Sequence, residues 1–158
     1  LFGWGFGVFV GLIDMLKAYL PMLIISLIYS SYDDIFFITS LAGTGAILGH
    51  IFPFFMNFNG GKGMACYFGM LFYFNFWFGL TVGVVSLILL MITNYVAAAT
   101  IITLISVPLF SYFFCPELSL NFIISMSILS VLIIIKHREN IFKILKGTET
   151  TFWSVIKK

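Results

Sequence analysis

Residues 64–114, MACYFGMLFYFNFWFGLTVGVVSLILLMITNYVAAATIITLISVPLFSYFF, decide the fold because these 51 residues contain no Asp, Glu, Lys or Arg. As one α-helix the stretch would be about 75 Å long at 1.5 Å per residue, whereas the hydrocarbon core of a bilayer is about 30 Å thick. The stretch must therefore fold back on itself, and its plausible breaks are Asn75 and the pair Thr93-Asn94. These breaks predict helices over 64–74, 76–92 and 96–114, with one long tilted span over 64–92 as the alternative.

Polar and turn residues divide the rest of the chain in the same way, into predicted spans over 6–28, 35–55 and 120–135. The composition agrees, since 61% of the residues are hydrophobic and 9% are charged, against about 25% charged in a typical soluble domain. Such a chain is too apolar for a water-soluble globule or for disorder, and its apolar runs lack the alternation of a transmembrane β-barrel. We therefore expect an all-α, polytopic integral membrane helix bundle with about six spans, forming a single membrane-embedded domain over residues 1–158.

The distribution of charge predicts the orientation of this bundle. With six crossings, Lys62 and the basic C-terminal tail fall on one side of the membrane, which the positive-inside rule makes cytoplasmic. The opposite side receives Asp33, Asp34 and Glu117 but no Lys or Arg. Five crossings would separate Lys62 from the tail, so the charge bias favours six. The net charge of +2 gives no reason to expect a nucleic-acid partner.

The loop Gly60-Gly61-Lys62-Gly63 is the most distinctive local feature. Glycines let the backbone approach a ligand closely, and several N–H groups pointing one way form an anion nest beside the lysine. The helix predicted to follow the loop adds positive potential at its N-terminus. The loop is not a nucleotide-binding P-loop, because Met56 and Gly63 stand where that pattern needs Gly and Ser or Thr. Taken alone, a glycine-rich turn with an interfacial lysine is the simpler interpretation.

A second polar cluster, His137, Arg138 and Asn140, follows the last predicted span. Histidine can accept a proton near neutral pH, arginine can bind a phosphate with two hydrogen bonds, and an asparagine amide can orient a neighbouring group. Taken alone, the cluster fits a basic anchor at the cytoplasmic surface. The predicted topology, however, places it on the same membrane face as Lys62. Together the two clusters suit a phosphorylated, lipid-linked substrate.

Two charged residues, Asp14 and Lys17, lie inside the first predicted span. They are three residues apart, so they share a helix face and can pair, and intramembrane charges usually face a bundle interior or a polar cavity. They fit either an ion pair that fixes the helix or part of a site. They also motivate the alternative of a small ion-coupled transporter, although the sequence shows no convincing internal repeat.

Three further residues have simpler interpretations. A lone histidine near a helix end, such as His50, is more often a hydrogen-bonding group than a catalyst. Cys66 and Cys115 lie in different apolar stretches without the spacing of metal ligands. We therefore expect two buried thiols and no metal site.

Four short motifs occur in a fixed order along the chain. They read Asp14-Met15-Leu16-Lys17, His50-Ile51-Phe52-Pro53, Phe58-Asn59-Gly60-Gly61-Lys62-Gly63-Met64-Ala65, and His137-Arg138-Glu139-Asn140-Ile141 followed by Lys146-Gly147-Thr148-Glu149. In the same order they resemble the D-x-x-K, G-H-x-F-P, F-x-G-G-K-G-V-A and H-R-x-N-I…G-x-E motifs of the bacterial acyl-phosphate:glycerol-3-phosphate acyltransferases, the PlsY family. The resemblance covers nearly the whole chain.

The resemblance implies an integral membrane enzyme of phospholipid biosynthesis in the bacterial plasma membrane. It implies transfer of a fatty acyl group from acyl phosphate to the 1-hydroxyl of glycerol 3-phosphate, giving lysophosphatidic acid and inorganic phosphate, with no cofactor, metal or required protein partner. His137 would position or deprotonate the hydroxyl, with Asn140 orienting and Glu149 supporting. The phosphate- and substrate-binding candidates are Gly60, Gly61, Lys62, Gly63, Arg138, Thr100, His50, Lys17 and Asp14.

The chain departs from the family pattern in two places. The family's first span and its Gly/Asn-rich first motif, which supplies a serine and an arginine to the phosphate site, are not found here. We therefore expect an N-terminally truncated chain with weak or no activity on its own. Where the family usually has Y-V-S-x-x-S, the chain reads Tyr95-Val96-Ala97-Ala98-Ala99-Thr100. Ala97 thus replaces the first serine, and only Thr100 keeps a hydroxyl.

Overall fold

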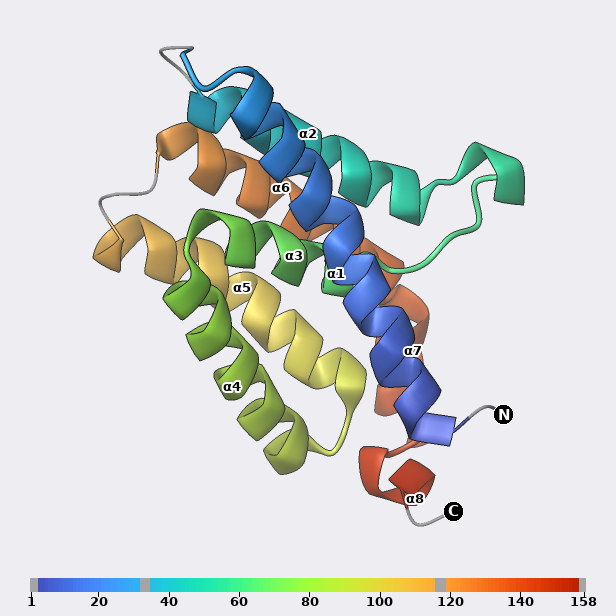
Figure 1. Cartoon of the computed structure of the whole chain (residues 1–158). Helices are drawn as coiled ribbons and strands as arrows, with labels where there is room; N and C mark the ends of the chain where they lie inside the picture. Colours follow the sequence, from blue (N-terminus) through green and yellow to red (C-terminus); the bar gives the residue numbers. More distant parts are fainter. Residues whose placement is uncertain (1–2, 32–34, 116–118, 157–158) are drawn as a thin grey trace.

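The computed structural model describes residues 3–31, 35–115 and 119–156, and every element within them is helical. Asp33, Asp34, Glu117, Lys157 and Lys158, which enter the predicted orientation, lie outside the described residues. The elements, shown in Figure 1, are α1 (Gly3–Ile28), α2 (Ile35–Ile51), the short 3-10 helix η1 (Phe54–Met56), α3 (Met64–Phe74), α4 (Phe76–Thr93), α5 (Val96–Phe114), α6 (Leu120–Lys136), α7 (Arg138–Leu145) and α8 (Phe152–Ile156).

The helix bounds follow the predicted breaks. The Asn75 side-chain oxygen accepts a hydrogen bond of 2.9 Å from the N–H of Phe78 and so caps α4, while Asn94 ends α4 in the left-handed conformation. Residues 64–92 therefore form two helices rather than one long span. The span predicted over 35–55 ends earlier, at Ile51, because Pro53 lacks an N–H and disfavours helical geometry in the residue before it.

The number of full spans is close to the predicted six but depends on how two helices are counted. By length and composition, four helices of the described residues can cross a membrane, one of them counted from α2 through η1. The helix α6 passes the same test only when it is taken together with α7, from which it is bent by 52°. The apolar helix α3 has 11 residues, or about 16 Å of length, which is too short to cross alone. Successive helices from α1 to α6 nevertheless reverse direction (Figure 1), in the alternating order that the sequence predicted.

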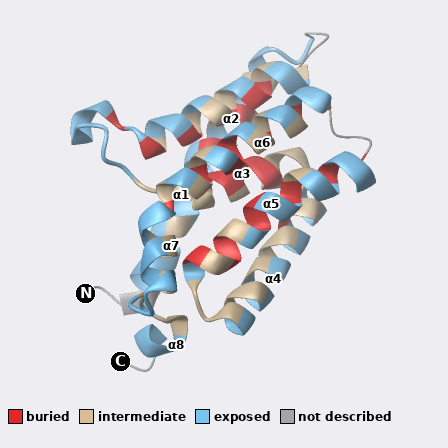
Figure 2. Cartoon of the chain, turned by 180° about the vertical axis from the view of Figure 1, so that it is seen from behind, coloured by how far each residue is buried: buried red, intermediate tan, exposed pale blue. Residues whose placement is uncertain are grey.

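The short helix α3 lies at the centre of the bundle, where it packs against α1, α2 and α4. Its residues Cys66, Tyr67, Met70 and Leu71 are fully buried, and Figure 2 shows the buried positions gathered on this helix. The Tyr67 hydroxyl and the Ser130 hydroxyl form a buried hydrogen bond of 2.9 Å that joins α3 to α6. The first residues of α3, which follow the glycine-rich loop, are therefore held firmly in the bundle.

The close packing of α3 on α1 predicts the effect of a one-carbon substitution. A Cβ at Gly69 would collide with the carbonyl group of Met15 in α1, and overpacking of this kind costs about 1–3 kcal/mol. We expect Gly69→Ala to lower the midpoint of thermal unfolding in detergent. Gly45→Ala is the matched control, because a Cβ there meets no atom within 4 Å and alanine favours a helix. Equal midpoints for the two variants would contradict the packing of α3 on α1.

Candidate active site

A chain of hydrogen bonds joins the glycine-rich loop to the C-terminal polar cluster. The Lys62 ammonium donates to the side-chain oxygen of Asn140 at 2.5 Å. The Asn140 amide in turn donates to a carboxylate oxygen of Glu149 at 2.7 Å. Residues separated by 78 positions in the sequence are thereby brought into direct contact. The predicted proximity of Lys62 to the tail cluster is confirmed.

The first two glycines of the loop hold it against the end of α2. The N–H of Gly60 donates to the carbonyl of Ile51 at 3.2 Å, and the N–H of Gly61 donates to the carbonyl of His50 at 3.1 Å. A Cβ at Gly60 would collide with the His50 carbonyl, and one at Gly61 would collide with the His50 ring. These two N–H groups were expected to face an anion, but in the structure they fasten the loop. Glycine is needed here for close approach between backbone segments.

The free donors lie one residue further on, at the start of α3. Gly63 has a φ of 92°, which glycine adopts readily, and it ends the loop as the uncapped N-cap of α3. The first four N–H groups of an α-helix have no partner within it, and the helix dipole gives this end a positive potential. Gly63 also lies beside Ile133 of α6. The α3 N-terminus and Lys62 therefore offer donors and positive charge near the end of α6.

His137 lies at that end of α6 and is held in one orientation. Its side chain is buried, with 4% of the residue exposed, and Nδ1 is 2.8 Å from the carbonyl oxygen of Ile133. Because a carbonyl can only accept, Nδ1 carries the hydrogen and Nε2 of the neutral ring is an acceptor. Nε2 has no hydrogen-bond partner among the residues that the structure describes.

The surroundings of His137 favour its neutral form. Burial lowers the pKa of His137 below its ordinary value of 6.5, and the charge of Lys62 acts in the same direction. The hydrogen bond to Ile133 and the charge of Glu149 act the opposite way but are outweighed. The ring is therefore neutral at pH 7, with Nε2 able to accept a proton.

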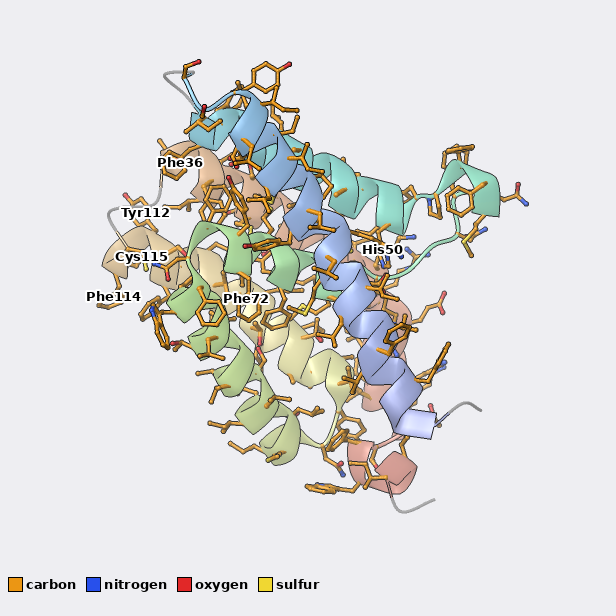
Figure 3. The ribbon with its side chains drawn as sticks, viewed as in Figure 1. Phe36, His50, Phe72, Tyr112, Phe114 and Cys115 are labelled. Atoms are coloured by element: carbon orange, nitrogen blue, oxygen red, sulfur yellow. The ribbon has the colours of Figure 1, made fainter. Side chains whose placement is uncertain are left out.

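Asp14, Lys17 and His50 form a separate group behind the loop. Asp14 accepts a hydrogen bond of 2.7 Å from Lys17, and the same oxygen lies 3.5 Å from Nδ1 of His50. His50, labelled in Figure 3, lies at the end of α2 beside α1. Lys17, His50, Gly60 and Gly61 are among the residues that line a cavity of about 420 Å³. The Asp14–Lys17 ion pair lies within α1, while the contact between Asp14 and His50 joins α1 to the end of α2, next to the loop.

Two predicted binding residues are not brought into the hydrogen-bonded chain. Arg138 begins α7, is exposed, and makes no hydrogen bond or ion pair with the described residues. Thr100 is buried in α5 and lines a different cavity, of about 410 Å³, together with Met15, Met64, Phe68 and Leu90 among others. The lining of this cavity is almost wholly apolar, and Phe72, labelled in Figure 3, belongs to it.

This apolar cavity is the feature that the sequence did not predict, whereas the donors at the start of α3 belong to the helix N-terminus predicted after the loop. Met64 connects them, because it begins α3 and also lines the cavity. The one signal for the cavity in the sequence was Met64, the apolar residue directly after the glycine-rich loop. Among the described residues, no group of three or more His, Cys, Asp or Glu side chains is placed to hold a metal ion.

The fold and the site define an integral membrane protein with a cluster of polar and positively charged groups at one end of its helix bundle. A family model described as glycerol-3-phosphate acyltransferase matches residues 1–147. The chain belongs to this glycerol-3-phosphate acyltransferase family, and it is therefore a membrane acyltransferase of phospholipid synthesis.

Relatives and solved structures agree with this assignment. The glycerol-3-phosphate acyltransferase of Pelagibacter ubique is 38% identical over 89% of this chain and 68% of its own length, and that of Bartonella henselae is 37% identical over 88% and 64%. The chain thus spans about two thirds of the length of these relatives.

Crystal structures of PlsY, an integral membrane glycerol 3-phosphate acyltransferase, are also similar. The glycerol 3-phosphate form has a TM-score of 0.83 and 32% identity, covering 94% of this chain and 72% of that one. The lysophosphatidic acid form has a TM-score of 0.84 and 31% identity, covering 98% and 77%. All of these matches are acyltransferases, so the transporter alternative has no support from them.

Proposed function

We propose that the chain transfers a fatty acyl group from acyl phosphate to the 1-hydroxyl of glycerol 3-phosphate, within one membrane-embedded domain over residues 1–158. The products are lysophosphatidic acid and inorganic phosphate. The observation that carries the proposal is the chain of hydrogen bonds from Lys62 through Asn140 to Glu149, beside the α3 N-terminus and His137. This arrangement supplies the positive charge that two phosphorylated substrates require.

In the proposed mechanism the protein binds and orients rather than forming a covalent intermediate. Lys62 and the N–H groups at the start of α3 bind phosphate oxygens. The 1-hydroxyl oxygen attacks the carbonyl carbon of acyl phosphate, and the bond from that carbon to the phosphate oxygen breaks. Inorganic phosphate leaves, while the hydroxyl proton passes to Nε2 of His137 or to the departing phosphate. Because acyl phosphate is already activated, holding the two substrates together supplies much of the acceleration.

The acyl chain fits the apolar cavity of about 410 Å³ that α1, α3, α4 and α5 enclose. Met64 lies both at this cavity and at the first turn of α3, so a chain lying in the cavity has its head group near the proposed phosphate donors. We assign Thr100 to this part of the site, beside the acyl chain.

The proposed orientation places the site at the cytoplasmic surface of a bacterial plasma membrane. Lys62 and Lys136, Arg138, Lys143 and Lys146 lie at the loop or helix ends that meet near the site. An excess of Lys and Arg is typical of cytoplasmic segments. Soluble glycerol 3-phosphate then enters from the cytoplasm, while the acyl donor enters from the bilayer.

A donor-specific assay tests the proposed reaction. The purified chain in liposomes is given labelled glycerol 3-phosphate with either palmitoyl phosphate or palmitoyl-coenzyme A. We expect lysophosphatidic acid to form only with palmitoyl phosphate, with one inorganic phosphate released for each product. The rate of lysophosphatidic acid formation is compared with that of Lys62→Met, so that even the weak turnover expected of this chain can be detected as a difference. Transfer from the coenzyme A donor, or equal product with and without Lys62, would contradict the proposal.

A further inference from the structure

The segment that follows α7 is attached to the bundle at two points. Near its beginning, the Glu149 carboxylate accepts the hydrogen bond from Asn140. Further on, the N–H groups of Phe152 and Trp153 donate to Asn94, in the turn between α4 and α5. We call residues 147–156 the C-terminal strap. The family model matches residues 1–147, so both attachments lie just beyond the matched residues.

Asn94 provides both acceptors of the second attachment. Its backbone carbonyl accepts from Phe152 at 2.8 Å, and its side-chain oxygen accepts from Trp153 at 3.0 Å. Asn94 adopts φ 60° and ψ 10°, a left-handed conformation that asparagine tolerates better than most residues. Trp153 is 43% exposed, and Val155 and Ile156 are more exposed still. Of the apolar side chains of the strap only Phe152 is partly buried, so the hydrogen bonds to Asn94 are a main part of what holds the strap.

The two attachments are too close in sequence to move independently. Glu149 and Phe152 are three residues apart, a reach of at most about 10 Å. On the other side, Gly147 turns the chain with φ 67°, and the N–H of Thr148 donates to the carbonyl of Lys143 in α7. Glu149 is thus fixed from both sides. A shift at Asn94 is passed to Glu149, and from there through Asn140 to Lys62.

We propose that Asn94 is a positioning residue for acyl transfer, acting through the C-terminal strap to hold Glu149 against Asn140. This inference rests on the proposed role of Lys62 in binding phosphate. Among the described residues, the Asn94 side chain forms a hydrogen bond only with the strap, and it makes no hydrogen bond to the polar site. The proposed effect on acyl transfer passes through Glu149, which the double variant below tests.

The test compares variants of Asn94 by two measurements. Asn94→Gly keeps the left-handed backbone but removes the side-chain acceptor, whereas Asn94→Asp keeps an acceptor. Asn75→Ala is the matched control, because it removes an asparagine cap at the other end of α4. Hydrogen exchange of the strap amides and the KM for glycerol 3-phosphate are measured for each variant. Losing one hydrogen bond corresponds to about a threefold to tenfold effect.

We expect Asn94→Gly to speed exchange of the strap amides and to raise the KM threefold to tenfold, with Asn94→Asp and Asn75→Ala within twofold of the unsubstituted chain. In a Glu149→Gln background, Asn94→Gly should add less than twofold, because both changes act on the same contact. Additive effects, or faster exchange with an unchanged KM, would overturn the positioning role and leave the proposed function intact. If the unsubstituted chain and Lys62→Met form product at the same rate, the proposed function fails, and the positioning role fails with it.

Discussion

Replacing Lys62 with methionine should reduce acyl transfer at least about a hundredfold, the usual effect of removing one group that stabilises developing negative charge. Methionine keeps much of the side-chain length but removes the ammonium that contacts Asn140. Lys62 is the cation directly beside the α3 N-terminus, so its loss weakens phosphate binding in both the ground state and the transition state. The measurement is kcat/KM for lysophosphatidic acid formation from palmitoyl phosphate.

Lys143→Met is the matched control for this experiment. Lys143 is also a lysine near the site, in the last turn of α7, but its side chain is exposed and lies outside the chain of hydrogen bonds. We expect its kcat/KM to stay within about twofold of the unsubstituted chain, because exposed surface charges contribute little. Both variants should unfold at temperatures close to that of the unsubstituted chain. Similar losses of activity in the two variants would mean that general positive charge, rather than Lys62, serves the substrate.

The helices could be predicted from the sequence because their ends are marked by residues with local effects. Asn75 and Asn94 separate α3, α4 and α5 as expected, since the first caps a helix with its side chain and the second tolerates a left-handed backbone. Pro53 ends α2 four residues before the predicted limit. That difference arises because hydropathy continues through the apolar residues 52–55, whereas the backbone is governed by the proline.

The candidate site was predictable as a set of residues but not as a set of contacts. Charge and topology were sufficient to bring Lys62 to the tail cluster, because both lie at the same end of an alternating bundle. They could not show that the N–H groups of Gly60 and Gly61 bind carbonyls of α2, since either use requires glycine. Nor could they show that Arg138, at the bend between α6 and α7, is exposed and lies outside the chain of hydrogen bonds.

His137→Gln should lower kcat by about a hundredfold or more, within the range typical of general acid–base groups, and should change the KM for glycerol 3-phosphate little. The reason is that Nδ1 of His137 is engaged by Ile133, which leaves Nε2 as the acceptor for the hydroxyl proton. Because glutamine cannot accept that proton with comparable basicity, the variant should bind substrate and turn it over slowly. If kcat falls less than about threefold, the proton goes directly to the departing phosphate, and His137 only lines the site.

The pH dependence separates these two outcomes further. A neutral His137 is the active form, and burial lowers its pKa in the free chain below 6.5, so kcat/KM should show loss of activity from this group only as the pH drops through the lowered pKa. Substrate phosphates, with a second pKa near 6, also titrate in this region. His137→Gln retains their titration but lacks that of the imidazole. A proton-accepting His137 therefore gives an acid limb that is steeper in the unsubstituted chain than in the variant, whereas parallel limbs would assign the whole pH effect to the substrates.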